Sequence, residues 1–229
     1  RQLRSIRRKV AKNMVRSKTI VPHVAHMEEL DISDLEQLRQ REKERLKQSS
    51  GQKLTLLSFV LKAVIRALKE FPVFNSSLDH EKEELILKSY YNIGFAADSP
   101  AGLLVPVIKE ADGKSIVELA SEIEDLAKMA RDGELEVSQM QGGSFTITNV
   151  GPLGGVSMVP AINYPEVAIL GMGRAEDKAV GRSGEICVRK ILPLTLAFDH
   201  RVADGADAAR FTARIVHLLS KPEALLLEA

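Results

Sequence analysis

The stretch that most constrains the fold lies near the end of the chain, where an apolar run leads into a histidine. Residues 191–198 are apolar at all but one position, which predicts a buried strand. His200 follows the run almost at once, and Asp204-Gly205 then turns the chain. Beyond this turn, apolar residues recur at helical spacing. We therefore expect a strand, a histidine-bearing turn and a helix in immediate succession.

His200 at such a junction has two interpretations. The backbone on both sides would hold the residue while its ring faces a cleft, which suits a general base, because imidazole groups ordinarily have a pKa of about 6.5. Alternatively, the histidine satisfies a local hydrogen bond, and Asp204 and Gly205 are ordinary turn residues. The stretch taken alone leaves both interpretations open.

Composition excludes several classes of protein. The 32 basic and 31 acidic residues nearly balance, so no overall charge predicts a nucleic-acid or membrane partner. Cys187 is the only cysteine, which rules out an intrachain disulfide and suits a reducing compartment such as the cytoplasm. No apolar run reaches the roughly 20 residues that span a bilayer. The chain starts inside a basic helical pattern with no apolar signal-peptide core, so we expect an excised domain.

The rest of the chain predicts an α+β fold in which a mixed sheet is layered with helices. Residues 56–70 are apolar around most of a helix, which predicts a centrally buried helix after a cap at Thr55. Ser33 followed by Glu36 has the pattern of a capping box. Further helices are expected at 3–17, 33–47 and 115–131, and strands at 23–32, 85–91, 92–97, 102–108, 144–150, 156–159 and 167–172.

The sequence predicts one domain over residues 1–229, because it contains no internal repeat, low-complexity tract or linker. His23 and His26 lie in an extended segment, too close together for ligation of a metal by residues one helical turn apart. No cysteine or carboxylate cluster with metal-ligand spacing joins them. We therefore predict no metal site.

The amino-acid sequences of several segments reduce the number of possible functions. The heptapeptide Asp-His-Arg-Val-Ala-Asp-Gly at residues 199–205 resembles the active-site signature of the dihydrolipoyl acyltransferases of 2-oxo acid dehydrogenase complexes, within the chloramphenicol-acetyltransferase-like superfamily. Two further segments are also similar to family segments: Gly-Gly-Ser-Phe-Thr-Ile-Thr-Asn-Val-Gly at 142–151 and Pro-Ala-Ile-Asn-Tyr-Pro-Glu-Val-Ala-Ile-Leu-Gly at 160–171. So are residues 17–23, 92–98 with 102–106, and 225–229, in the family's order. The overall wording is most similar to bacterial acetyltransferases of the pyruvate complex.

This resemblance implies an α+β, chloramphenicol-acetyltransferase-like mixed sheet and a homotrimer with its active-site channel between neighbouring subunits. The implied reaction moves an acyl group between the thiol of dihydrolipoamide and coenzyme A. His200 would be the general base for the coenzyme A thiol. Thr148 stands where the family has a serine that stabilises the tetrahedral oxyanion, and it would come from a different subunit than His200. Without the family context, Thr148 is an ordinary strand threonine.

The resemblance also implies supporting residues. Asp204 would hold the active-site loop through an ion pair, with Arg39 as one possible partner, whereas Asp199 and Arg201 are expected to be structural. A second expectation is that coenzyme A contacts Arg39 and three further residues. Each of the four also has a simpler interpretation. Arg39 would lie on a solvated helix face, and Thr55 would cap a helix. Asp98 would be a turn residue, and Asn149 would make a hydrogen bond within a loop.

The implied partners are further copies of the chain, because trimers of the family assemble into a cubic or dodecahedral cage. The apolar tail at 225–227 would suit a contact between trimers. Other partners would be the lipoyl domain, the 2-oxo acid decarboxylase and dihydrolipoamide dehydrogenase, in a bacterial cytoplasm. The lipoyl and peripheral-subunit-binding domains lie outside this sequence. Three alternatives stay open: transfer of a branched-chain or succinyl group, O- or N-acyl transfer on the same fold, and a non-catalytic scaffold.

Overall fold

The computed structural model describes residues 5–100, 102–151 and 154–228, which form a mixed sheet with helices packed against one face. The strands of the main sheet are ordered β1-β9-β7-β6-β4-β5, and β8 pairs with the outer part of β9. The strands are β1 His23–Asp31, β4 Ile93–Phe95, β5 Val107–Ile108, β6 Phe145–Asn149, β7 Ala168–Met172, β8 Glu176–Arg182 and β9 Glu185–Asp199; a separate hairpin joins β2 Ser76–Asp79 to β3 Glu84–Leu87.

The centre of the sheet is parallel, because β4, β6 and β7 run in the same direction, while β1, β5 and β9 are antiparallel to their neighbours. Parallel strands that are covered on both faces usually have nearly continuous apolar sequences. Every residue of β7 is buried, as is every residue of β6 except Asn149. The predicted α+β fold class with a mixed, helix-covered sheet is confirmed.

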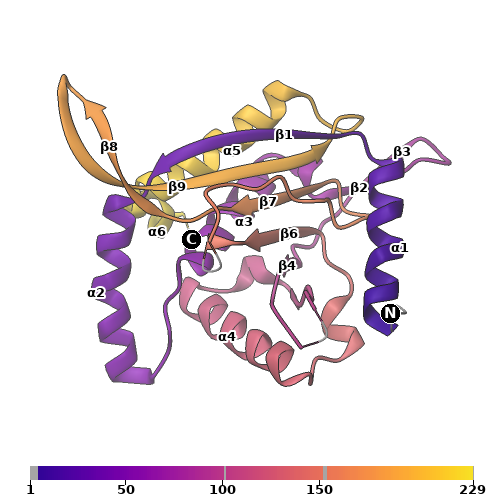
Figure 1. The fold of residues 1–229 in the computed structure, drawn as a ribbon, viewed down its shortest axis with the longest axis horizontal. Helices are drawn as coiled ribbons and strands as arrows, with labels where there is room; N and C mark the ends of the chain where they lie inside the picture. Colours follow the sequence, from indigo (N-terminus) through magenta and orange to yellow (C-terminus); the bar gives the residue numbers. More distant parts are fainter. Residues whose placement is uncertain (1–4, 101, 152–153, 229) are drawn as a thin grey trace.

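Helices form one covering layer and flank the two ends of the sheet (Figure 1). In Figure 1, α3 and α5 lie behind the strands, α4 lies below them, and α1 and α2 stand at opposite ends. The main hydrophobic core lies between this helical layer and the sheet. The helices are α1 Ser5–Ile20, α2 Ser33–Ser50, α3 Leu56–Glu70, α4 Ile116–Asp132, α5 Gly205–Ser220 and α6 Pro222–Leu227, with short 3₁₀ turns at Pro72–Phe74, Ala111–Gly113 and Val137–Met140.

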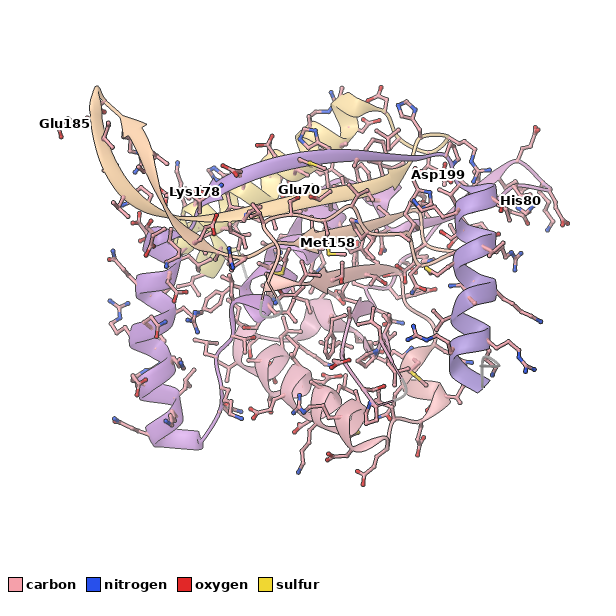
Figure 2. All side chains as sticks on the ribbon, in the orientation of Figure 1. Glu70, His80, Met158, Lys178, Glu185 and Asp199 are labelled. Atoms are coloured by element: carbon pink, nitrogen blue, oxygen red, sulfur yellow. The ribbon has the colours of Figure 1, made fainter. Side chains whose placement is uncertain are left out.

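An irregular segment, residues 154–166, covers the opposite face of the sheet. Met158 lies over the sheet in Figure 2, and its Cγ would be 3.4 Å from a Cβ atom placed on Gly171 of β7. Ser157 shares a hydrogen bond of 3.1 Å with Thr195 on β9. The prediction of a strand at 156–159 is therefore wrong. This segment crosses the face of the sheet, so its backbone does not pair with a neighbouring strand.

Three further expectations are corrected. Ser33 lies inside α2, where its hydroxyl donates to Asp31 and accepts from the N–H of Lys190, so it forms no capping box with Glu36. Thr55 occupies the N-cap of α3 but makes no capping hydrogen bond. The expected strands at 85–91 and 102–108 are shorter, at 84–87 and 107–108, and β2 was not predicted because Ser76–Asp79 has little apolar alternation.

A projecting hairpin and the C-terminal helix carry several of the exposed apolar side chains. The β8–β9 hairpin projects from the body, with Glu185 at its tip in Figure 2. Ile186 and Val188 on this hairpin are exposed. In the C-terminal α6, Leu225 is buried within the chain, but Leu226 and Leu227 are exposed.

A cluster of aromatic side chains packs around Phe211 of α5 in the hydrophobic core, and a substitution there tests the fold. The Phe211 ring lies 4.5 Å from that of Phe74 and 6.1 Å from those of Phe71 and Phe145, and its side chain is fully buried. We expect Phe211→Ala to lower the free energy of unfolding by about 3–5 kcal/mol in urea titrations, because it leaves a cavity. Val137→Ala is the control, since Val137 is 60% exposed. Equal effects of both changes would contradict this placement of the core.

Candidate functional site

The predicted histidine turn is held at its backbone on both sides. The N–H of Asp199, at the end of β9, donates to the carbonyl of Val167 over 2.8 Å. The N–H of His200 donates to the carbonyl of Pro22 over 3.1 Å, just before β1. The His200 side chain is exposed, and its ring lies 5.9 Å from the ring of Phe198. The turn therefore presents an accessible imidazole from a fixed backbone.

Asp199 and Arg201 stabilise this turn. The Asp199 carboxylate is only 2% exposed and accepts two hydrogen bonds, of 3.0 and 2.7 Å, from the Arg201 guanidinium. It also accepts the backbone N–H of Arg201 over 3.0 Å. A bidentate, charge-assisted contact of this kind is geometrically specific. These contacts within the turn are the kind expected of residues with a structural role.

Asp204 caps the helix that follows the turn. Its carboxylate accepts the N–H groups of Ala206 and Asp207 over 2.8 and 2.9 Å, and Asp207 in return accepts the N–H of Asp204 over 3.1 Å. This reciprocal pattern is a capping box, and it fixes where α5 begins. Within the described part of the chain, the expected pairing between Asp204 and Arg39 is not formed.

Thr148 lies at the other end of the sheet, where the parallel strands β6 and β7 finish. Its side chain is 7% exposed, and among the described residues its hydroxyl makes no hydrogen bond. Asn149 follows it, and the Asn149 side chain accepts the N–H of Gly151 over 3.0 Å. Asp98 is exposed and follows β4, which pairs in parallel with β6. The carboxyl ends of parallel strands meet at one edge, so Asp98, Thr148 and Asn149 share this edge.

Arg39 and Thr55 adjoin one another on α2 and at the start of α3. The Arg39 guanidinium donates to both Glu36 carboxylate oxygens over 2.7 Å and to the Leu54 carbonyl over 3.0 Å. The hydrogen bonds with Arg39 lower the pKa of Glu36. The Thr55 hydroxyl is buried and has no hydrogen-bond partner among the described residues. In Figure 1, α2 stands at the end of the sheet toward which β6 points, on the side of Thr148.

The strand registers separate His200 from Thr148 within one chain. Thr148 lies opposite Gly171 on β7, and Gly171 lies opposite Thr195 on β9. Asp199 is four residues farther along β9, a distance of about 13 Å at roughly 3.3 Å per residue. Two strand spacings add about 10 Å across the sheet. The His200 imidazole and the Thr148 hydroxyl of one chain therefore do not meet at a single reacting atom.

His23 is a half-buried polar residue to which sequence reasoning assigned no role. Its Nδ1 lies 2.8 Å from the Val21 carbonyl, and its Nε2 accepts the N–H of Ile162 over 3.1 Å. These contacts require the neutral tautomer with the proton on Nδ1. Burial lowers the pKa of His23. The histidine thus ties the start of β1 to the segment that covers the sheet.

Glu166 is the second residue to which sequence reasoning assigned no role. The sequence feature that could have indicated it is an acidic residue next to an apolar strand. Its side chain is 4% exposed and accepts the Asn163 amide over 3.2 Å. Burial raises the pKa of Glu166 to about 7, against smaller lowering effects of a Thr146 hydrogen bond and the Lys88 charge. One carboxyl oxygen, Oε2, has no hydrogen-bond partner among the described residues.

Neither a metal centre nor a membrane segment is found in the described part of the chain. No group of three or more histidine, cysteine or acidic side chains there could hold a metal ion. No helix among residues 5–100, 102–151 and 154–228 is long and apolar enough to cross a membrane.

The arrangement of sheet and helices defines the class of fold. Chloramphenicol acetyltransferase superposes with a TM-score of 0.57 and 19% identity over 95% of this chain, a likeness that shows the fold alone. The chain belongs to the 2-oxoacid dehydrogenases acyltransferase (catalytic domain) family, whose model matches residues 1–227. The family resemblance and the chloramphenicol-acetyltransferase-like fold are thus confirmed.

Individual relatives agree with this assignment. The dihydrolipoyllysine-residue acetyltransferase component of the pyruvate dehydrogenase complex from Bacillus subtilis is 48% identical over 228 residues, all of this chain and 51% of the relative. The chain therefore spans about half the length of such curated relatives. A dihydrolipoamide acetyltransferase structure from Azotobacter vinelandii has a TM-score of 0.93 and 46% identity, covering 96% of this chain and 90% of that one. The structure of a truncated catalytic core of the 2-oxoacid dehydrogenase multienzyme complex from Thermoplasma acidophilum has a TM-score of 0.88 and 40% sequence identity. The match covers 97% of this chain and 98% of that one.

The capping role of Asp204 predicts a difference between two substitutions. Asp204→Ala removes the acceptor for two N–H groups of α5, so we expect the free energy of unfolding to fall by about 1 kcal/mol. Asp204→Asn retains a capping oxygen and is expected to cost only a few tenths of that amount. Urea denaturation of both variants measures the difference. An equal loss in both would contradict the capping role.

Proposed function

We propose that this chain is the catalytic core of a dihydrolipoyllysine-residue acyltransferase, which moves an acetyl group between dihydrolipoamide and coenzyme A. One observation carries the proposal. The Azotobacter vinelandii enzyme was investigated for the role of a serine, a histidine and an asparagine in its catalytic mechanism; the serine precedes the histidine by 52 positions, and the asparagine follows it by four. Here Thr148 precedes His200 by 52 positions, and Asp204 follows it by four.

The residues at two of these positions differ in ways that preserve the chemistry. Threonine retains the hydroxyl of serine and adds a methyl group. Aspartate retains the oxygen that an asparagine would offer to the start of α5. The histidine is unchanged. The trio therefore keeps a base, a hydroxyl donor and a helix cap.

In the proposed mechanism, the His200 imidazole takes the proton of the coenzyme A thiol. A thiol with an ordinary pKa of about 8.5 is mostly protonated near neutrality, and its thiolate is the nucleophile. The sulfur attacks the thioester carbonyl of acetyl-dihydrolipoamide, and the Thr148 hydroxyl donates a hydrogen bond to the resulting oxyanion. When the carbon–sulfur bond to dihydrolipoamide breaks, the imidazolium returns its proton to the departing sulfur. The reverse reaction uses the same groups in reverse order.

The site is proposed to lie between two subunits of a homotrimer. The separation of His200 from Thr148 along the sheet supports this arrangement, because the His200 end of one chain must face the Thr148 end of another. One solved relative forms the cubic core of the pyruvate dehydrogenase multienzyme complex. A cage of such trimers would cover the exposed Leu226 and Leu227.

The coenzyme A contacts remain proposals at Thr55, Asp98 and Asn149, and at Arg39. The free Thr55 hydroxyl and the exposed Asp98 carboxylate support them. Arg39 already neutralises Glu36, so its contribution to a phosphate contact would be weaker than that of a free arginine. Asn149 would have to share an oxygen that now binds Gly151.

The remaining assignments rest on the relatives. We propose that the chain works with a lipoyl domain, a peripheral-subunit-binding domain, a 2-oxo acid decarboxylase and dihydrolipoamide dehydrogenase, in the cytoplasm of a bacterium. We propose residues 1–229 as one catalytic domain, to which the acyl group arrives on a lipoyl arm. The curated relatives named as acetyltransferases of the pyruvate complex favour acetyl over branched-chain or succinyl groups.

Acetyl transfer from acetyl-CoA to free dihydrolipoamide tests the catalytic roles. We expect His200→Ala to lower kcat by at least about 10²-fold, because it removes the base. Thr148→Val keeps the shape but loses the hydroxyl, so we expect a loss of about 10²–10³-fold, whereas Thr148→Ser should retain most activity. Isobutyryl-CoA and succinyl-CoA, run in parallel, identify the acyl group. Activity that survives His200→Ala would refute the mechanism, and an assembled chain inactive on all three would support the scaffold.

A mixing experiment tests the shared site. His200→Ala and Thr148→Val subunits are each expected to be inactive alone. In trimers reassembled from equal amounts of both, about one quarter of the sites would combine an intact His200 with an intact Thr148, so about one quarter of the wild-type activity should return. Mixtures of each variant with wild-type chain control for reassembly. No recovery in reassembled mixed trimers would place both groups in one subunit.

A further inference from the structure

Glu166 is a buried ionisable group that the proposed mechanism leaves unused. It lies at the end of the covering segment, two residues before the first residue of the apolar strand β7. A Cβ atom on Gly143 would come within 2.8 Å of its Oε1, so the loop before β6 passes close to the carboxyl. A carboxylate that is buried without a paired cation costs free energy, and the neutral acid is the favoured form.

The contacts of Glu166 connect it to the strand of Thr148. Its carboxyl hydrogen-bonds with the Thr146 hydroxyl and accepts the Asn163 amide. Thr146 and Thr148 are two residues apart on β6, so both side chains project from the same face of the sheet. The Asn163 side chain itself accepts a long hydrogen bond, of 3.4 Å, from Asn13 on α1. The carboxyl thus joins β6, the covering segment and α1.

The same residue adjoins the turn of His200. The residue after Glu166 is Val167, whose carbonyl accepts the N–H of Asp199 over 2.8 Å. Asp199 in turn anchors the His200 turn through Arg201. A displacement of Glu166 would therefore act on the Thr148 strand on one side and on the His200 turn on the other.

We propose that Glu166 is a positioning residue of the acyl-transfer site, which as a neutral acid holds β6 and the His200 turn against the covering segment. This inference rests on the proposed acyltransferase function. Oε1 accepts the Asn163 amide, and Oε2 has no hydrogen-bond partner among the described residues, so the neutral acid can carry its proton on Oε2 and keep its contacts with Asn163 and Thr146. The ionised form puts a charge into the packed interior, which loosens this junction.

The surroundings offer little compensation for that charge. Glu166 lies beside a cavity of about 830 Å³, whose other titratable side chains are Lys88, Tyr90 and Tyr164. The Lys88 ammonium lies 3.5 Å from the Gly143 carbonyl, and burial lowers the pKa of Lys88. From the other sides, α1 contributes Asn13, and residues 140–143 contribute no titratable group. Because burial raises the pKa of Glu166 to about 7, the junction is expected to change near neutral pH.

The test compares pH profiles of acetyl transfer for wild type, Glu166→Gln and Glu166→Ala. In the wild type, we expect kcat to fall as the pH rises from 7 to 9. Glutamine offers similar hydrogen bonds and cannot ionise, so kcat at pH 6.5 should stay within about threefold of wild type and the fall should disappear. Alanine should lower kcat about tenfold or more at every pH, with KM for coenzyme A nearly unchanged. Glu134→Gln, at an exposed carboxyl, is the matched control.

A second measurement separates this inference from the proposed function. Amide hydrogen exchange across residues 145–149 and 199–203 is recorded at pH 6 and pH 8.5, after correction for intrinsic exchange rates. We expect exchange at the higher pH to accelerate in wild type and not in Glu166→Gln. If the wild type transfers no acetyl group but shows this difference in exchange, the proposed acyltransferase function is refuted, and the proposed role of Glu166 in holding the junction is supported. If Glu166→Gln has the pH profile and exchange of wild type, the positioning role is overturned.

Discussion

The pairing of β9 with its neighbours is the constraint on which the rest of the structure depends. This 15-residue strand pairs with β1 on one side and with β7 and β8 on the other. Its inner half is buried on both faces, so a register shift of one residue would exchange its core-facing and covered side chains. The register therefore decides where Asp199 ends the strand. The position of the His200 turn follows from it.

The same sheet explains why the two proposed catalytic groups lie at opposite ends of one chain. β9 is antiparallel to β7, while β6 is parallel to β7, so the end of β9 lies beside the beginnings of the parallel strands. His200 follows the end of β9, and Thr148 lies near the end of β6. A single chain thus presents half of the proposed site at each end. Catalysis under this proposal requires assembly, because only a second chain completes the constellation.

Two polar side chains, one buried and one half-buried, join the covering segment to the sheet. His23 accepts the N–H of Ile162, and Glu166 binds Thr146 and Asn163. Each of these groups links segments that are distant in sequence, and each makes specific hydrogen bonds where apolar packing alone would allow sliding. The segment that they hold is irregular, so it has no backbone ladder to define its position. Side-chain hydrogen bonds take over that role.

Local pattern determined the helices and the main strands of this protein. Residues 56–70 are apolar around the helix and form the buried α3, and the apolar run at 191–198 forms the inner half of β9, because burial in each case follows from periodicity. The motif wording also identified the family and the candidate residues. Only the tertiary structure decided that 156–159 lies across the sheet, that Asp204 caps α5, and that Glu166 is buried beside Thr146. These facts depend on contacts between segments far apart in the chain, and no periodicity within one segment specifies them.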